Sequence, residues 1–193
     1  MKRIIFSLCV IAGLLFCTKG HSQNKIFIKA IGSTGDGTAT GIFNGGSTAD
    51  RHPNEIEAIA YTDGLAGCAG PLSGGGGGLC KSSNTPFIFS MPVSFALISF
   101  KYNLVNGKFL NSVDMVIHKN GESGYDFYKV HMEVVKVVSV SEGAGSDSLG
   151  INIELQPQKI AWQITKLLPD GRPGDKFSYG WDFSANKAFT YTF

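Results

Sequence analysis

The clearest periodic stretch of the chain reads Ser148-Leu149-Gly150-Ile151-Asn152-Ile153-Glu154-Leu155-Gln156. Its large apolar residues alternate with small or polar residues from one end to the other. A period of two is typical of a β-strand with one buried face, because successive side chains point to opposite sides of a sheet. The stretch therefore predicts a strand at 148–156 and favours a β-rich fold.

Other parts of the chain have the same character. Residues 128–136 also alternate, until the doublet Val134-Val135 shifts the phase and leaves Lys136 on the polar side, which predicts a β-bulge. Further strands are predicted at 25–31, 55–62, 87–89, 112–119, 159–166 and 177–183.

One segment is expected to be helical. Phe95, Ile98, Tyr102 and Val105 recur at helical spacing, and Gly107 follows where a C-cap glycine would stand. The sequence contains no repeat of solenoid length and no linker between two cores. The chain is therefore predicted to be one mostly β domain, closed or nearly closed, that carries one helix.

The first 22 residues are expected to be a signal peptide. Lys2 and Arg3 precede the apolar run 4–16, and residues 20–22 place small residues before a cut ahead of Gln23. The apolar run is shorter than the roughly 20 residues that a membrane-spanning helix needs, so no stable membrane insertion is expected. Export to the periplasm or the cell exterior follows from this interpretation.

Lipidation of Cys17 is the alternative to simple cleavage. Phe16 precedes this cysteine, however, whereas lipidated cysteines follow a small residue. The mature domain is taken as 23–193. The whole chain has 17 Lys and Arg against 15 Asp and Glu, and three of the basic residues lie in the leader, which leaves 14 against 15. Without a basic run, a nucleic-acid surface is not expected.

No motif indicates catalysis. The run Gly74 to Gly78 lacks the Gly-Lys-Ser/Thr that closes a phosphate-binding loop. Glu55 and Glu57 share a strand face, but solvation explains two surface carboxylates as well as acid–base chemistry does. None of the mature histidines has a second histidine or a cysteine at metal-ligand spacing, and these are His52, His118 and His131. No catalytic, cofactor-binding or metal-binding residue is assigned, and an enzyme is not expected.

Cys68 and Cys80 are a stronger signal. They are an even pair in an exported chain, and they bracket the polyglycine run. A disulfide between them would close a 13-residue loop. In the entropy model, this restriction of the unfolded chain stabilises the folded protein by roughly 3 kcal/mol. A disulfide is predicted here, with free thiols as the alternative.

Short motifs follow one another in a specific order along the mature chain. They are IFIK at 26–29, GSTADRH at 46–52, NEIEA at 54–58, the polyglycine loop, a Phe-x-Phe strand at 87–89, QPQK at 156–159 and SYGWD at 178–182. In order and spacing, this series resembles the haemolysin-coregulated proteins, the tube-forming family of type VI secretion systems. The resemblance extends from about residue 25 to residue 186.

The resemblance implies a small two-sheet β-barrel with one flanking α-helix, here at 93–106. Members of the family form six-membered rings that stack into a hollow tube, and the tube carries effector proteins or is expelled with them. It implies no cofactor and no active site. The expected partners are therefore further copies of the chain, and effector proteins in the lumen.

The resemblance also suggests where subunits would meet. An extended loop reaches the next subunit in such rings, and the segments 32–50 and 64–85 are the candidates. The residues expected to take part in assembly are Gly46, Asp50, His52, Gly74 and Gly78, and Thr62 is expected to face the lumen.

Three features depart from the family pattern. The chain has its own signal peptide, about ten additional residues at 34–44, and the cysteine pair. The leading hypothesis is therefore an exported, non-enzymatic, ring-forming structural protein. The alternative is a secreted monomeric binding module or adhesin on the same barrel, outside any contractile needle.

Overall fold

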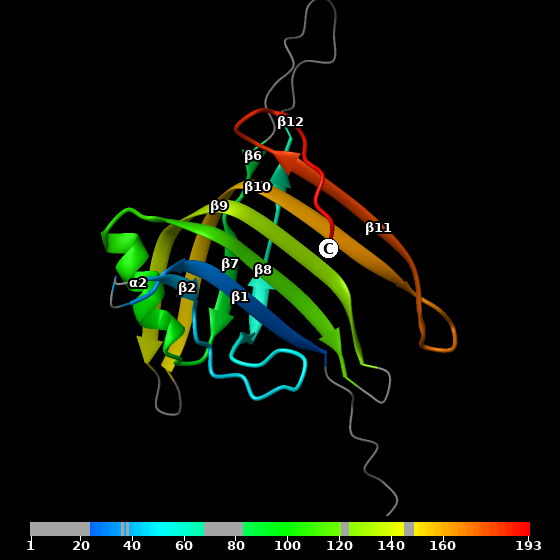
Figure 1. Cartoon of the computed structure of the whole chain (residues 1–193), viewed down its shortest axis with the longest axis horizontal. Coiled ribbons are helices and arrows are strands. Elements are labelled where there is room, and N and C mark those ends of the chain that lie inside the picture. The colour runs from blue at the N-terminus through cyan, green and yellow to red at the C-terminus, as the bar shows by residue number, and fades with distance from the viewer. Residues whose placement is uncertain (1–23, 36, 38, 68–82, 121–123, 145–148) are drawn as a thin grey trace, which may run out of the picture.

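Strands dominate the computed structural model, which describes residues 24–35, 37, 39–67, 83–120, 124–144 and 149–193 (Figure 1). The one helix of this part of the chain is α2 (Ala96–Val105). The strands are β1 (Lys25–Ser33), β2 (Thr40–Ile42), β3 (Ile56–Ala58), β4 (Ala60–Thr62), β5 (Leu65–Ala66), β6 (Ser83–Asn84), β7 (Phe87–Met91), β8 (Phe109–Lys119), β9 (Tyr125–Ala144), β10 (Leu149–Leu167), β11 (Pro173–Asp182) and β12 (Lys187–Ala188).

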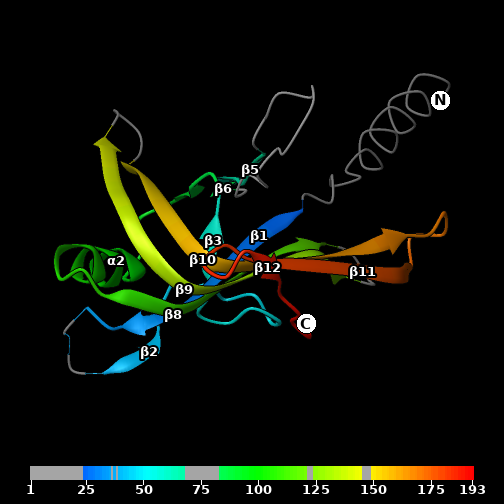
Figure 2. The ribbon, with the colours of Figure 1, turned by 90° about the horizontal axis from the view of Figure 1, so that it is seen from above.

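Ten strands form one curved antiparallel sheet, in the order β12-β11-β10-β9-β8-β1-β2. Three short strands join it at the side: β7 pairs with β10, β4 with β7, and β3 with β1. β5 and β6 form a separate two-stranded sheet. Figure 2 shows that the long strands β9 and β10 bend sharply, so that the sheet curls around its own inner face. The predicted mostly β fold with one helix is confirmed.

Residues 149–156 of the quoted stretch lie in β10, and their alternation is confirmed by burial. Ile151, Ile153 and Leu155 are fully buried in the core, while the neighbouring Gly150 and Asn152 are exposed. The strand pairs with β9 on one side and with β7 on the other. One face of this part of the strand is buried in the core and the other is not, and this difference explains why the period of two is so regular.

Pro157 lies inside β10, where two separate strands were predicted. On one side its partner is Val135 of β9. On the other side β7 ends its pairing at Leu155, and β11 begins at Lys159. Proline has no N–H to donate to a ladder, so it is tolerated where one neighbour has ended and the next has not begun. The strand therefore continues through the proline.

The curl does not close into a complete barrel by hydrogen bonds. β3 pairs with β1 at one edge, and β4 pairs with β7 at the other. The chain itself crosses from one edge to the other at Ile59, whose N–H donates to the Ser90 carbonyl at 2.8 Å. The fold thus differs from the expected two-sheet barrel in one respect, since a single sheet curls around and the covalent chain joins its edges.

The helix is confirmed, but the stripe that predicted it is not the buried one. Phe95 and Val105 are each 79% exposed, whereas Leu97 and Phe100 pack into the core. The helix ends at Val105, and Gly107 follows in the predicted C-cap region with φ +62. At ten residues, α2 is shorter than the predicted 93–106, and no helix in the described residues is long and apolar enough to span a membrane.

The predicted phase change at Val134-Val135 is present in β9. Core side chains come from Val130 and Met132 before it and from Val135 and Val137 after it. The change of phase occurs through Val134, whose φ is 51. Both ladders nevertheless keep their register at this point, and the pairing with β10 shifts further along β9, between Val137 and Ser139. The irregularity at Val134 is therefore a local change of backbone conformation, and the bulge lies further along the strand.

Candidate functional site

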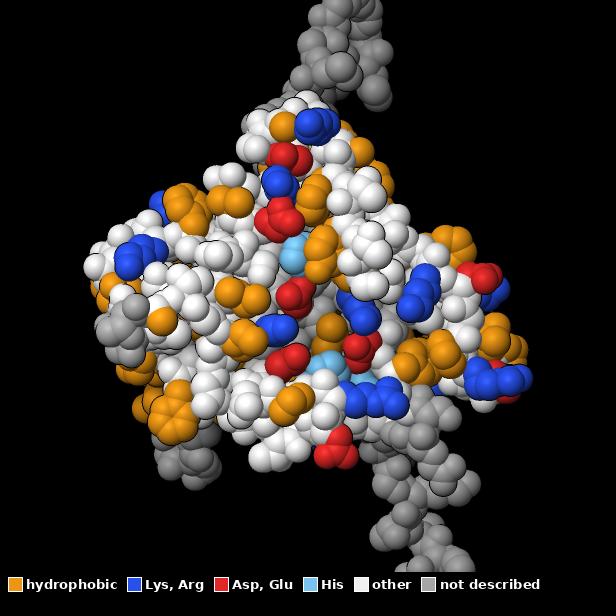
Figure 3. Space-filling model, in the orientation of Figure 1, with side chains coloured by type: hydrophobic (Ala, Val, Ile, Leu, Met, Phe, Trp, Pro, Cys, Tyr) orange, Lys and Arg blue, Asp and Glu red, His pale blue; other side chains and the backbone are white. Residues whose placement is uncertain are grey.

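Charged and polar side chains cover the outer face of the strands β1, β8 and β9. Lys29, Asp114 and Lys129 alternate with core residues such as Met115 and so point away from the core. In Figure 3 acidic, basic and histidine side chains form a band across the middle of this face. A pocket of about 250 Å³ lies within the band. This outer face is the candidate functional site.

The segment after β2 folds closely over this face. Phe43 is buried in the core, with its ring 5.1 Å from that of Phe100. Gly45 donates to the carbonyl of Asn54 at 2.8 Å, and a Cβ on Gly45 would lie 2.4 Å from the Glu55 carbonyl oxygen. Glycine is therefore required at this close approach. The segment 44–55 is held against its own sheet.

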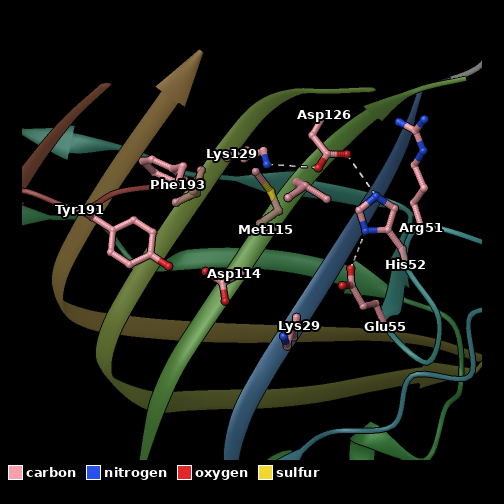
Figure 4. A pocket seen from close by; sticks show the side chains of 12 residues that line it. Lys29, Arg51, His52, Glu55, Asp114, Met115, Asp126, Lys129, Tyr191 and Phe193 are labelled. Atoms are coloured by element: carbon pink, nitrogen blue, oxygen red, sulfur yellow. Dashed lines mark hydrogen bonds and ion pairs between the residues drawn. The ribbon is translucent and has the colours of Figure 1, made fainter. Parts of the chain in front are cut away.

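His52 is the centre of the site (Figure 4). Its ring stacks on Phe27 of β1, with centroids 4.2 Å apart and an angle of 16° between the planes. Nδ1 donates to Glu55 Oε2 at 3.0 Å, and Nε2 donates to Asp126 Oδ1 at 3.1 Å. The buried imidazole is thus held between two carboxylates on a flat apolar support.

These contacts change the acidity of both partners. Burial by itself lowers the pKa of His52, but the hydrogen bonds and charges of Asp126 and Glu55 outweigh it and raise the pKa to about 9. Burial likewise raises the pKa of Asp126, yet hydrogen bonds from His52 and His118 and the charge of Lys129 hold this pKa far below its usual value. At neutral pH the pair is an imidazolium and a carboxylate.

His118 completes the group. Its Nδ1 donates to the same Asp126 Oδ1 at 2.9 Å, and its ring meets that of His52 edge-on, with centroids 5.3 Å apart. His118 lies on β8 directly opposite Asp126 on β9. One nitrogen of each histidine and one Asp126 oxygen all lie within 4.8 Å of one another.

This group could not be predicted from local sequence spacing, because His52 and Asp126 are 74 residues apart. The opposition of His118 and Asp126 could have been found by pairing the two strands that flank the turn at Asn120-Gly121. The position of His52 depends on how the segment 44–55 folds, for which the sequence has no periodic signal. The expectation that no metal site exists rested on sequence spacing, and the observed convergence is the reason to reconsider it.

The C-terminal residues lie along the other end of the same face. Tyr191 stacks on His131, with centroids 3.6 Å apart and an angle of 7°. His131 Nδ1 donates to Asp114 Oδ1 at 2.5 Å on this outer face. Its side chain is nevertheless buried, because Tyr191 covers it. Tyr191 and Phe193 line the pocket.

The residues predicted to take part in assembly differ in exposure where the structure describes them. Gly46 has φ +81 and open space around its Cα, and Asp50 is exposed, whereas His52 is buried in the site described above. Thr62 is exposed at the end of β4. The remaining predicted residues fall outside the described part of the chain, namely Cys68, Gly74, Gly78 and Cys80. The disulfide and the lumen-facing position stay predictions.

The segment 32–50 is not the extended loop that was expected. Gly32 belongs to β1, β2 folds back on it as a hairpin, and Phe43 anchors the following residues in the core. In the segment 64–85, the described residues form the short β5–β6 ladder.

The described residues form a curled antiparallel sheet with one flanking helix and a polar outer face. This arrangement defines a class of small β proteins. The particular family follows from the sequence itself. The profile of the family described as type VI secretion system effector, Hcp, matches residues 27–164, which is more than half of the chain. The chain belongs to the Hcp family, whose members are structural subunits of the type VI secretion tube.

Solved structures agree with this fold. One, described as a type six secretion system protein, has a TM-score of 0.74 at 19% identity and covers 86% of this chain and 100% of its own. Hcp1 from Salmonella typhimurium has a TM-score of 0.66 at 23% identity and covers 86% and 99%. A type VI secretion system effector from Yersinia pestis has 0.62 at 18% and covers 81% and 98%. A comparison with curated protein sequences finds no match.

Proposed function

We propose that the mature protein is an exported structural subunit that assembles head to tail into closed rings of six. Membership of the Hcp family supports a tube subunit. The observation that carries the proposal is a surface that a monomer leaves uncovered. It lies on the part of β10 and β11 that extends beyond the body, together with Leu65 of β5, and it is called here the arm surface: Leu65, Trp162, Ile164, Phe177 and Tyr179.

The arm surface is a continuation of the core-facing side of the sheet. Ile160, Trp162 and Ile164 alternate on one face of β10, and they change from fully buried through partly buried to 53% exposed. Phe177 lies directly opposite Ile164 and is 62% exposed. Paired residues that face each other across a ladder share a face, so this apolar strip is contiguous. Contiguous exposed apolar area of this kind marks an interaction site.

A second apolar surface lies on α2 and the residues just before it, and it is called here the helix surface: Val93, Phe95, Ile98 and Val105, all exposed. The helix α2 and the β10–β11 turn lie at opposite ends of the molecule in both views (Figures 1 and 2). Two different surfaces on opposite ends produce a head-to-tail contact, which closes into a ring when the rotation per subunit divides a full turn. The number six is taken from the resemblance to the tube-forming family.

Export is part of the proposal and rests on residues 1–22. An oxidising compartment would suit a Cys68–Cys80 disulfide. A subunit that leaves the cell by its own signal would assemble outside the cytoplasm, in the periplasm or beyond. Effector proteins in the lumen are the proposed cargo, in line with the family.

Light scattering after size exclusion tests this proposal on protein recovered from its export route. The expected mass is about six times that of the mature chain, with a central hole in electron micrographs. Intact mass of the same sample should correspond to an N-terminus at Gln23 without an acyl chain. A strictly monomeric species at tens of micromolar would contradict ring assembly and favour a secreted binding module or adhesin instead.

A further inference from the structure

Three side chains from separate parts of the chain converge on one point of the outer face. His52 comes from the segment before β3, His118 from β8 and Asp126 from β9. We propose that these three residues bind one zinc ion. The site is independent of ring assembly, since none of the three belongs to the arm surface or the helix surface.

The spacing of the ligand atoms suits a tetrahedral ion. With metal–ligand bonds of about 2.0–2.1 Å, neighbouring ligand atoms around such an ion are about 3.3 Å apart. Asp126 Oδ1 lies 3.1 Å from His52 Nε2 and 2.9 Å from His118 Nδ1. These two oxygen–nitrogen spacings need only small shifts for coordination, whereas the two imidazole nitrogens, which lie within 4.8 Å of each other, would have to move closer together.

Neighbouring residues orient two of the three ligands. Glu55 Oε2 accepts from His52 Nδ1 at 3.0 Å, which directs Nε2 toward Asp126. Lys129 Nζ lies 3.3 Å from Asp126 Oδ2, and so leaves Oδ1 for the two histidines. A carboxylate behind a ligating histidine is the usual partner in zinc sites, because it fixes the ring and strengthens it as a donor.

The contact between His52 Nε2 and Asp126 Oδ1 also requires a positive charge between the two atoms. With Nδ1 donating to Glu55, a neutral His52 would turn the lone pair of Nε2 toward the Asp126 carboxylate oxygen. Two acceptors at 3.1 Å repel each other unless something positive lies between them. A proton meets this demand in the hydrogen-bonded form, and a divalent ion meets it in the coordinated form.

The donor set favours zinc over magnesium or calcium. Two imidazole nitrogens and one carboxylate oxygen suit Zn²⁺, whereas Mg²⁺ and Ca²⁺ prefer oxygen ligands alone. The side chains of His52 and His118 are 8% and 12% exposed, and both line a second pocket of about 240 Å³ that also contains Asp50. This pocket offers entry for the ion and room for a fourth ligand.

A bound ion would join three elements that hydrogen bonds now hold together. The segment 44–55 would be cross-linked to the β8–β9 hairpin, which Arg51 already reaches through its bond to the Gly124 carbonyl. An ion that binds only the folded chain raises its stability by mass action. The melting temperature should therefore rise with Zn²⁺ concentration.

The experiment uses the full mature protein after removal of metals with EDTA and alkylation of thiols, so that Cys68 and Cys80 cannot bind the ion. Calorimetric titration with Zn²⁺ should show one ion per chain. Co²⁺, used as a spectroscopic probe, should give the visible absorption of a tetrahedral site. Mg²⁺ should give neither signal.

Variants then locate the ion. His118→Gln or Asp126→Asn should weaken Zn²⁺ affinity by at least about 100-fold, and Glu55→Gln by about 10-fold, because outer partners matter less than ligands. His131→Gln is the matched control, since it removes an imidazole that pairs with a carboxylate elsewhere on the same face. Circular dichroism establishes that each variant is folded.

Two results would overturn the proposal. One is a wild-type protein that binds no Zn²⁺ at micromolar concentration, a result that needs no variant to fold. The other is unchanged affinity in folded His118→Gln, which places the ion elsewhere. Either result leaves the ring proposal standing, because the mass of the assembly is measured separately.

Discussion

The folded structure raises the pKa of His52, and so the stability of the fold depends on pH. Its unperturbed pKa is 6.5, and in the folded chain the pKa is about 9. A group whose pKa is raised on folding contributes stability that is complete below 6.5 and is lost as the pH rises through about 9. Asp126 has the opposite sign, so its contribution is present above 3.8 and is lost on acidification.

The first prediction compares wild type with His52→Gln in the presence of EDTA. At pH 6 the variant should be less stable by about 2 kcal/mol, because it loses charge-assisted hydrogen bonds. This difference in the free energy of unfolding should shrink between pH 6.5 and 9, as the wild-type imidazolium loses its proton. Urea denaturation at several pH values measures it.

Glu55→Gln serves as the control for the cause of this shift. It removes one of the two carboxylates that hold the proton on His52 and keeps Asp126. The pH at which stabilisation is lost should then move down. A stability difference that is constant from pH 6 to pH 10 would refute the assigned ionisation.

How far such residues could be predicted depends on the range of the interaction. The opposition of His118 and Asp126 follows from strand pairing across a short turn and was within reach of the sequence. The stacking of His52 on Phe27 was not, because it depends on a segment without periodicity. Gly45 likewise carries no signal in sequence, since only the folded chain shows how closely it approaches Glu55.

Among the elements, the strands were predicted best because their burial is one-sided. The predicted alternation is present in the burial of residues 149–156 of β10. The break expected between 156 and 159 was wrong, because Pro157 happens to lie between the ends of two partner strands. The helix was placed correctly, but both of its faces carry apolar residues, so the sequence could not say which face would be buried.

The second prediction concerns Val134 in β9. A β-branched residue at φ 51 is strained, because its side chain crowds the backbone in this region. Val134→Asn should therefore stabilise the protein by about 1 kcal/mol, since asparagine tolerates this conformation. Thermal and urea unfolding report the change.

Val116→Asn provides the comparison for that substitution. Val116 is also half-buried in a strand, but it is not among the described residues with positive φ. The same replacement there should destabilise, because it only removes a residue suited to a strand. If both substitutions changed stability equally, strain at Val134 would not be the cause of the gain.

For the whole molecule, the order of motifs identified the family and hence the fold, although every single motif was weak. The closure of the sheet at Ile59 was not predictable, because a continuous strand at 55–62 looks the same whether it has one partner or two. The arm surface was also hidden. Ile164 and Phe177 have the pattern of core residues, and only the structure shows that the body ends before them.

The third prediction tests head-to-tail contact by mixing two blocked variants. Ile98→Asp disables the helix surface, and Phe177→Asp disables the arm surface, so each variant alone should be monomeric. In an equimolar mixture, the intact arm surface of Ile98→Asp can bind the intact helix surface of Phe177→Asp. The mixture should therefore contain dimers of the two variants and nothing larger, because both surfaces left free in such a dimer are blocked. Mass photometry or light scattering distinguishes dimer from ring.

Ile42→Asp is the matched control for this mixing experiment. Ile42 is as exposed as Ile164, at 53%, but it lies on β2 outside both surfaces. Its substitution should leave the ring intact. Rings formed by either blocked variant alone would show that the two surfaces are not the contact.

The crossing of the chain at Ile59, between β3 and β4, also determines where the fold opens first. β3 and β4 are each held by three residue pairs, whereas β9 and β10 are paired along most of their length. Amide exchange should therefore be fastest along this seam, since local opening follows the least supported strands. Once it opens, the sheet uncurls and presents two free edges. Such edges can pair with another copy, so strand swapping between chains would begin here rather than at the long central ladder.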